Sequence, residues 1–150
     1  MNQTFAEILL FVFVAINAAL LIFIAGVLGK VMNDMDEPAF KHFAMSLYRH
    51  STRSLFMNTV LTVPFLGAIP YFCFYGFKNS WITAGLAIWL LAGSIGKMIK
   101  LPVFKSVATL ASSDAAELIS ARKKLNFGNM LQAVLNFVSA ALMTVAFIHH

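Results

Sequence analysis

Three amide side chains, Asn129, Gln132 and Asn136, recur near the carboxyl end of the chain at spacings of three and four residues. Residues at these spacings share one face of a helix. An amide offers donors and an acceptor without a charge, so this face could bind and orient a polar group. Asn17 and Asn58 are two further amides in apolar surroundings. We therefore take these five amides as candidate ligand-binding residues, and we assign no catalytic residue.

Amides in an apolar segment have two interpretations, because lipid offers them no hydrogen bonds and they should turn toward neighbouring helices. In the first interpretation they form hydrogen bonds between helices, worth on average about 0.6 kcal/mol each. In the second interpretation they line a polar pocket that opens toward one leaflet of a membrane. The sequence leaves both interpretations open.

Residues typical of metal, nucleotide or acid–base chemistry are sparse. His42 and His50 lie eight residues apart, whereas helical zinc ligands are usually three or four apart, so we expect no metal site. No phosphate-binding glycine loop or dinucleotide fingerprint occurs, and we expect no cofactor. Glu7 stands at the edge of an apolar run, which we interpret as a membrane interface. His149 and His150 are either native or the start of a purification tag, and we give them no role.

The composition of the 150-residue chain decides the class of protein that must position these amides. Hydrophobic residues make up 60% and charged residues 11%, against about 45–50% and about 25% in soluble domains. Mean hydropathy is +0.81. These values exclude an ordinary soluble domain, a disordered chain and a typical nucleic-acid-binding module. Four apolar runs are long enough to cross a bilayer as helices, which predicts an all-α integral membrane four-helix bundle as a single domain over 1–150. The predicted spans are 8–29, 55–77, 80–96 and 127–148.

The basic residues predict an orientation in the membrane. The chain has 11 Lys and Arg residues, and all of them except Lys78 fall in the two connections 30–54 and 97–126. An excess of Lys and Arg marks the cytoplasmic side. We therefore expect an integral protein of a bacterial inner membrane, with both termini outside and these two connections in the cytoplasm. Lys97 and Lys100 would extend from the short third span toward the cytoplasmic interface.

Both cytoplasmic connections have helical patterns. Asp36 followed by Pro38 is typical of a helix start, and apolar residues then recur at three- and four-residue spacing. This segment would lie on the membrane surface or run into the second span. In the second connection we expect a helix break at Pro102, and then a new helix that begins with Asp114 and Glu117 at capping-box spacing. The second and fourth helices would thus extend into the cytoplasm.

The layout of the chain resembles a family of small four-helix membrane proteins related to anthrone oxygenases. The resemblance rests on the end of the first helix at Ala25-Gly26, on EPAFKHFAMSLYRHS before the second, and on WLLAGSIGKMIKLPVFKSVATLASSDAAEL. That family often carries a Trp-x-x-x-(His/Asn)-x-x-Arg motif at the start of helix four. The matching positions here are Leu125, Asn129 and Gln132, so only Asn129 agrees. The resemblance implies a four-helix fold, a lipophilic substrate and, at most, a cofactor-independent oxygenase-like activity.

Three functional hypotheses follow from these observations. The first is a bundle with a polar-lined pocket for a lipophilic small molecule, in the bilayer and without nucleic acid as a partner. The second is a non-enzymatic accessory subunit or self-associating bundle, because small residues on the first and third helices allow close helix approach. These small residues are Ala25, Gly29, Gly85, Gly93 and Gly96. The third, a small oligomeric transporter, is least favoured because four helices are few for alternating access.

Overall fold

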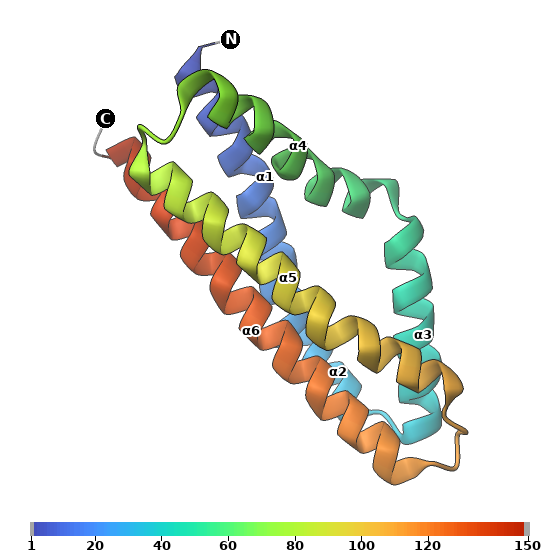
Figure 1. Ribbon diagram of the computed structural model, residues 1–150. Helices are drawn as coiled ribbons and strands as arrows, with labels where there is room; N and C mark the ends of the chain where they lie inside the picture. The colour runs from blue at the N-terminus through green and yellow to red at the C-terminus, as the bar shows by residue number, and fades with distance from the viewer. Residues whose placement is uncertain (1, 149–150) are drawn as a thin grey trace.

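The computed structural model describes residues 2–148, so Met1, His149 and His150 lie outside the described residues. Every regular element within this range is a helix (Figure 1). The elements are α1 (Gln3–Phe23), a π-helical turn η1 (Ile24–Leu28), α2 (Gly29–Asp34), α3 (Glu37–Arg53), α4 (Leu55–Tyr75), α5 (Ser80–Thr109) and α6 (Ala115–Ile148).

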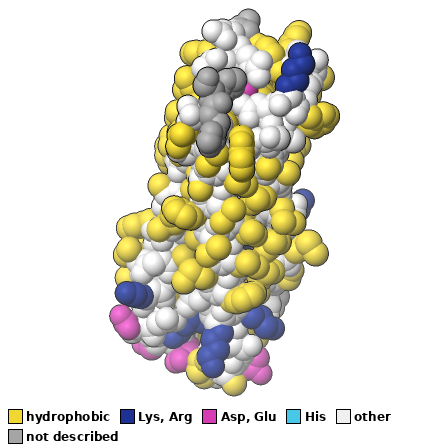
Figure 2. Space-filling view, turned by 90° about the vertical axis from the view of Figure 1, so that its left-hand side faces the viewer, with side chains coloured by type: hydrophobic (Ala, Val, Ile, Leu, Met, Phe, Trp, Pro, Cys, Tyr) yellow, Lys and Arg dark blue, Asp and Glu magenta, His cyan; other side chains and the backbone are white. Residues whose placement is uncertain are grey.

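Four helical segments are long and apolar enough to cross a membrane, by length and composition. The structure thus confirms the predicted all-helical class and four helices of this kind. Hydrophobic side chains cover the middle of the molecule, whereas most charged side chains gather at one end (Figure 2). The four segments are Gln3–Asp34, in which α1, η1 and α2 run on continuously, Leu55–Tyr75, Ser80–Thr109 and Ala115–Ile148.

The helices are arranged around a long antiparallel pair, because α5 and α6 lie side by side over most of their length (Figure 1). Helix α1 packs against α6, and α4 packs against α1 rather than against α5. Both ends of the chain lie at the same end of the molecule as the α4–α5 turn. We call the opposite end, which holds the α2–α3 and α5–α6 connections, the basic end.

Two predicted helix boundaries differ from the structure. The prediction of a helix break at Pro102 is wrong, because α5 continues past this proline to Thr109. Proline removes one backbone donor, and here Val103 and Val107 bury their side chains beyond it and hold the helix together. Helices α3 and α4 are separate, because Ser54 between them has extended backbone (φ −71°, ψ 119°), and the Ser54 hydroxyl accepts a hydrogen bond from the Met57 N–H at 3.3 Å.

Helix α3 begins where the sequence predicts. The Asp36 carboxylate accepts a hydrogen bond from the Ala39 N–H at 2.8 Å, and proline occupies the first turn. Its apolar face, with Phe40 and Ala44 fully buried, packs against α5 and α6. Asp114 precedes α6, but its carboxylate accepts from the Ala111 N–H at 2.7 Å, on the loop side. The apolar stripe of α3 therefore covers the basic end of the α5–α6 pair.

The interior holds two apolar clusters, one at each end of the molecule. The cluster near the termini joins α1, α4, α5 and α6, and the cluster at the basic end joins α2, α3, α5 and α6. Along α6 the first cluster ends at Met143 and the second ends at Leu125. The amides of α6 lie between these two residues. The three α6 amides among the predicted site residues thus lie in a layer between two apolar cores.

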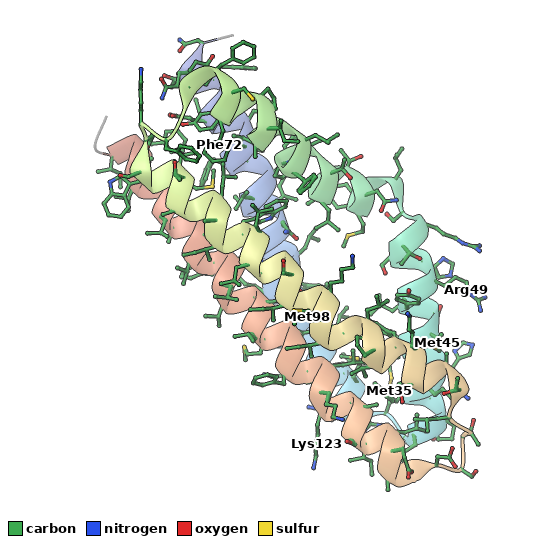
Figure 3. The ribbon with its side chains drawn as sticks, viewed as in Figure 1. Met35, Met45, Arg49, Phe72, Met98 and Lys123 are labelled. Atoms are coloured by element: carbon green, nitrogen blue, oxygen red, sulfur yellow. The ribbon has the colours of Figure 1, made fainter. Side chains whose placement is uncertain are left out.

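Arg122 fixes the corner between α2 and α3 at the basic end. The side chain is buried, and its guanidinium donates to the Asn33 and Asp36 carbonyl oxygens, both at 3.4 Å. It also lies 4.7 Å from the centre of the Phe40 ring, a cation–π distance. Arg49 and Lys123, in contrast, point outward from this end (Figure 3).

Candidate functional site

The polar layer is built from side chains of α1, α5 and α6. The Asn17 amide N–H donates to the Asn136 oxygen at 3.2 Å, and the Asn136 amide N–H donates to the Gln132 carbonyl oxygen at 2.8 Å. Asn17 and Asn136 are 5% and 1% exposed, so their hydrogen bonds join α1 to α6 away from solvent. Ser139 donates to the Gly85 carbonyl oxygen at 2.7 Å and joins α6 to α5. This part of the layer does what the first interpretation predicts: it connects helices.

Lys100 enters the same layer from α5. Its ammonium group donates to the Asn129 side-chain oxygen at 3.2 Å and to the Gln132 side-chain oxygen. The side chain thus turns toward α6, where we expected it to extend toward the interface. Lys100 takes one of the two acceptor positions of the Gln132 oxygen, so this amide can still offer its N–H groups and one further acceptor position.

Asn58 does not join the polar layer. It is exposed on α4 and donates to the Thr52 carbonyl oxygen at 3.4 Å, near the α3–α4 boundary. The prediction that grouped it with the α6 amides assumed that the start of α4 packs on the other helices. Helix α4 diverges from them at this end (Figure 1), so Asn58 has no neighbour among the four other candidates.

A groove of about 330 Å³ opens between α4 and α5 beside the polar layer. We call it the central groove. Its floor includes two of the predicted residues, Asn17 and Gln132, whereas Asn129 and Asn136 lie behind it. Leu61, Phe65 and Leu90 are 41–53% exposed, so the groove is open along the molecular surface. The lining residues are Asn17, Leu61, Thr62, Phe65, Trp89, Leu90, Gly93, Ser94, Lys97 and Gln132.

Trp89 gives the groove a polar group without a partner. The side chain is only 6% exposed, and within residues 2–148 its indole N–H meets no acceptor. A buried donor without an acceptor is uncommon, because leaving it without a hydrogen bond costs about 1–3 kcal/mol of folding free energy. Gly93 keeps the groove open, since a Cβ at this position would meet nothing within 4 Å. At Gly96 a Cβ would overlap the Gln132 amide, so this glycine makes room for that side chain.

A second polar cluster lies near the termini, around Glu7 of α1. Glu7 is fully buried, and its Oε1 accepts from the Tyr71 hydroxyl at 2.7 Å, the Gln3 amide at 2.9 Å and the Asn79 amide at 3.2 Å. These donors come from α1, α4 and the α4–α5 turn. The carboxyl group thus links the α4–α5 turn to α1 inside the protein, near the end of the molecule that holds this turn.

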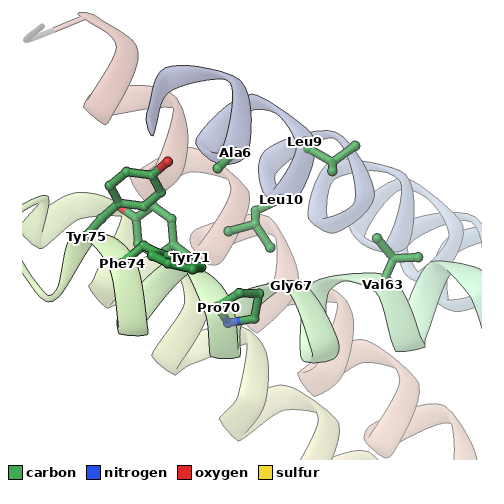
Figure 4. Close-up of a pocket in the computed structure, with 9 residues that line it drawn as sticks. All are labelled: Ala6, Leu9, Leu10, Val63, Gly67, Pro70, Tyr71, Phe74 and Tyr75. Carbon is green, nitrogen blue, oxygen red and sulfur yellow. The ribbon is translucent and has the colours of Figure 1, made fainter. Parts of the chain in front are cut away.

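An apolar groove of about 340 Å³ runs between α1 and α4 beside this cluster (Figure 4). Leu9 and Leu10 contribute from α1, and Pro70, Phe74 and Tyr75 from α4. Glu7 is not among its lining residues. This groove therefore offers an apolar surface with few polar groups, unlike the central groove.

Sequence reasoning did not single out three polar side chains that the structure buries or draws into polar contacts: Glu7, Trp89 and Lys100. Glu7 could have been suspected, because it is the only acidic residue before Asp34 and begins the first apolar run. Nothing in the sequence distinguishes Trp89 from a core residue, since an aromatic residue within an apolar helix usually belongs to the core. Lys100 was assigned to the interface because the third span was ended at Gly96, before the helix in fact ends.

No family model, curated protein or solved structure matches this chain. The chemistry of the central groove therefore has to be argued from its own residues. They provide an apolar wall, two amides, the hydroxyls of Thr62 and Ser94, the Trp89 side chain and the ammonium group of Lys97. Within residues 2–148, no group of three or more His, Cys, Asp or Glu side chains could hold a metal ion. The arrangement can bind and orient an amphipathic molecule.

Proposed function

We propose that this chain is a small integral membrane protein that binds a lipophilic small molecule in the central groove. The observation that carries the proposal is the buried indole N–H of Trp89, which has no acceptor in the described chain and belongs to a side chain that lines an open groove. An oxygen atom of a bound molecule would satisfy it. The exposed apolar residues beside it would contact the rest of that molecule.

The interpretation of the amides as structural hydrogen bonds accounts for part of the layer only. Asn17, Asn129 and Asn136 all have protein partners. The indole N–H of Trp89 has none among the described residues. A buried donor without an acceptor, in a side chain that lines the same open groove as Gln132, favours a ligand over packing alone.

The membrane placement is part of the same proposal. The four helices would form a bundle across the bilayer, with the basic end and its helical extensions in the cytoplasm and both chain ends outside. The resemblance to proteins related to anthrone oxygenases fits a lipophilic ligand, and an oxygenase-like activity would be its enzymatic form. Self-association through small residues is less favoured, because Gly85 and Gly96 already face α6 within the chain.

Tryptophan fluorescence provides a direct test, because the chain has 2 tryptophans and only Trp89 lines the groove. In a Trp81→Phe variant, emission reports on Trp89 alone. We expect a brominated long-chain lipophile, titrated into the detergent-solubilised protein, to quench this emission with a saturable curve.

The matched control fills the groove without disturbing the helices. A leucine at Gly93 has open space around its Cβ, so Trp81→Phe/Gly93→Leu should fold and lose saturable quenching. If both variants are quenched alike and in proportion to the bromine concentration, the lipophile reaches Trp89 from the micelle and the proposal is wrong.

A further inference from the structure

We propose that the ligand of the central groove is a lipophilic acid, with its carboxylate held by Lys97 and Gln132. This inference rests on the proposed function and specifies its ligand. It follows from the kind of hydrogen-bonding group that each polar lining residue presents, and from where these groups lie along α5.

The polar groups of the groove are not distributed evenly along it. The Trp89 indole and the Lys97 ammonium group can only donate hydrogen bonds. Gln132 offers its amide N–H groups and one acceptor position of an oxygen that already accepts from Lys100. Asn17, which donates to Asn136, keeps its oxygen, Ser94 donates to the Leu90 carbonyl oxygen at 3.0 Å and keeps its lone pairs, and the Thr62 hydroxyl can donate or accept. A carboxylate carries acceptor sites only, and it therefore matches the donors of Lys97 and Gln132.

The sign of the charge also favours an acid. Lys97 lines the groove and is exposed, and Lys100 lies directly behind Gln132. All six acidic residues of the chain lie outside the lining of the groove. An anionic group would thus meet two ammonium groups, whereas an amine would meet like charge in a medium of low dielectric constant.

The groove is polar at one end and apolar at the other. Trp89 and Lys97 are eight residues apart on α5, which is about 12 Å along the helix axis at about 1.5 Å per residue. The Lys97 end lies toward the basic end of the molecule. Leu61, Phe65 and Leu90 extend the wall with exposed apolar side chains. With the carboxylate between Lys97 and Gln132, the alkyl chain of the ligand would lie along these apolar residues and face the bilayer.

The experiment compares a brominated long-chain fatty acid with its methyl ester, in the Trp81→Phe background and at a pH where the acid is ionised. The ester keeps the chain and the bromine but loses the charge. We expect both to quench Trp89 saturably, and the acid to bind about tenfold more tightly, as one charge-assisted hydrogen bond would require. Lys97→Met, which keeps an apolar stem, should abolish the difference, and Lys105→Met on the far part of α5 should preserve it.

The possible outcomes separate the two proposals. Equal saturable affinity for acid and ester would overturn the acid assignment and leave the lipophile-binding groove in place. Absence of saturable quenching by either molecule would overturn both. Phosphatidylglycerol forms a third arm, because its phosphate is also an anion: if it displaces the brominated acid at equal mole fraction, the groove is a site for an anionic lipid and the acid assignment is wrong.

Discussion

A single ammonium group, that of Lys100, contacts two of the amides of α6, one of which lines the central groove. It donates to the side-chain oxygens of Asn129 and Gln132. Without it, both oxygens would lose their donor in a layer that excludes most water. Lys100 therefore leaves Gln132 its N–H groups and one acceptor position to offer a ligand.

Replacing Lys100 with methionine should destabilise the protein while keeping the length of the side chain. Hydrogen bonds to a charged group contribute about 1.5–3 kcal/mol, and the loss of the buried charge offsets part of this. We expect the free energy of unfolding to fall by about 1–2 kcal/mol, measured by denaturant titration in detergent micelles. Lys105→Met, at an exposed position of the same helix, is the control and should change it by less than about 0.5 kcal/mol. Equal effects of the two substitutions would show that Lys100 does not hold the amides.

At this scale the sequence predicts which residues are polar and buried, but not which atoms meet. The three- and four-residue spacing of the α6 amides places them on one face, and the structure buries Asn129 and Asn136 there. The position of Asn58 in the sequence does not predict that α4 diverges from the other helices at this end. The burial of Glu7 is not predictable either, because the three donors that stabilise its carboxyl group come from separate segments of the chain.

Glycines decide how the helices approach one another. Ser139 donates to the Gly85 carbonyl oxygen at 2.7 Å, and a Cβ at Gly85 would overlap Met143 and lie 3.0 Å from the Ser139 carbonyl oxygen. A Cβ at Gly93, two turns along the same helix, would meet nothing within 4 Å. Gly85 thus allows a close contact between α5 and α6, whereas Gly93 belongs to the central groove.

Substitution of these two glycines by alanine should have opposite effects. Gly85→Ala must push α5 away from the α6 backbone, and overpacking of this kind costs about 1–3 kcal/mol. Gly93→Ala adds no clash and gains helix propensity, up to about 1 kcal/mol. Thermal unfolding in detergent should therefore show a lower midpoint for the first variant and an equal or higher one for the second. A lower midpoint for Gly93→Ala would mean that this position is packed and that the groove is narrower than described.

The presence of the helices is predictable from this sequence, whereas the residues at which they end are less predictable. Apolar length alone predicts four spanning helices, and Asp36 with Pro38 marks the start of α3. Proline tends to end a helix, but at Pro102 the burial of Val103 and Val107 outweighs this local tendency. The same tertiary packing carries α5 well past the last residue of the predicted third span. Contacts between segments far apart in the chain decide such ends, and no local pattern encodes them.

The whole molecule is asymmetric along its long axis. Apolar side chains surround its middle, and the basic end carries most of the charged residues (Figure 2). One of them, Arg122, is also needed inside, where it donates to the carbonyl oxygens of Asn33 and Asp36. The charges that predict orientation thus partly build the fold at that end. A reversed orientation would place this charged end across the membrane, against the general bias of Lys and Arg.

Accessibility of single cysteines in intact cells tests the predicted orientation. Cys73, the only native cysteine, is first replaced by serine, and one new cysteine is then introduced per variant. Lys78→Cys lies in the exposed α4–α5 turn, and Ser112→Cys lies in the exposed α5–α6 connection at the opposite end. Because basic connections remain in the cytoplasm, a membrane-impermeant maleimide should label position 78 in intact cells and position 112 only after the cells are opened. Labelling of position 112 in intact cells, with position 78 protected, would reverse the orientation. It would also turn the Lys97 end of the central groove toward the outer leaflet, so that a lipophilic acid would enter from the other side of the bilayer.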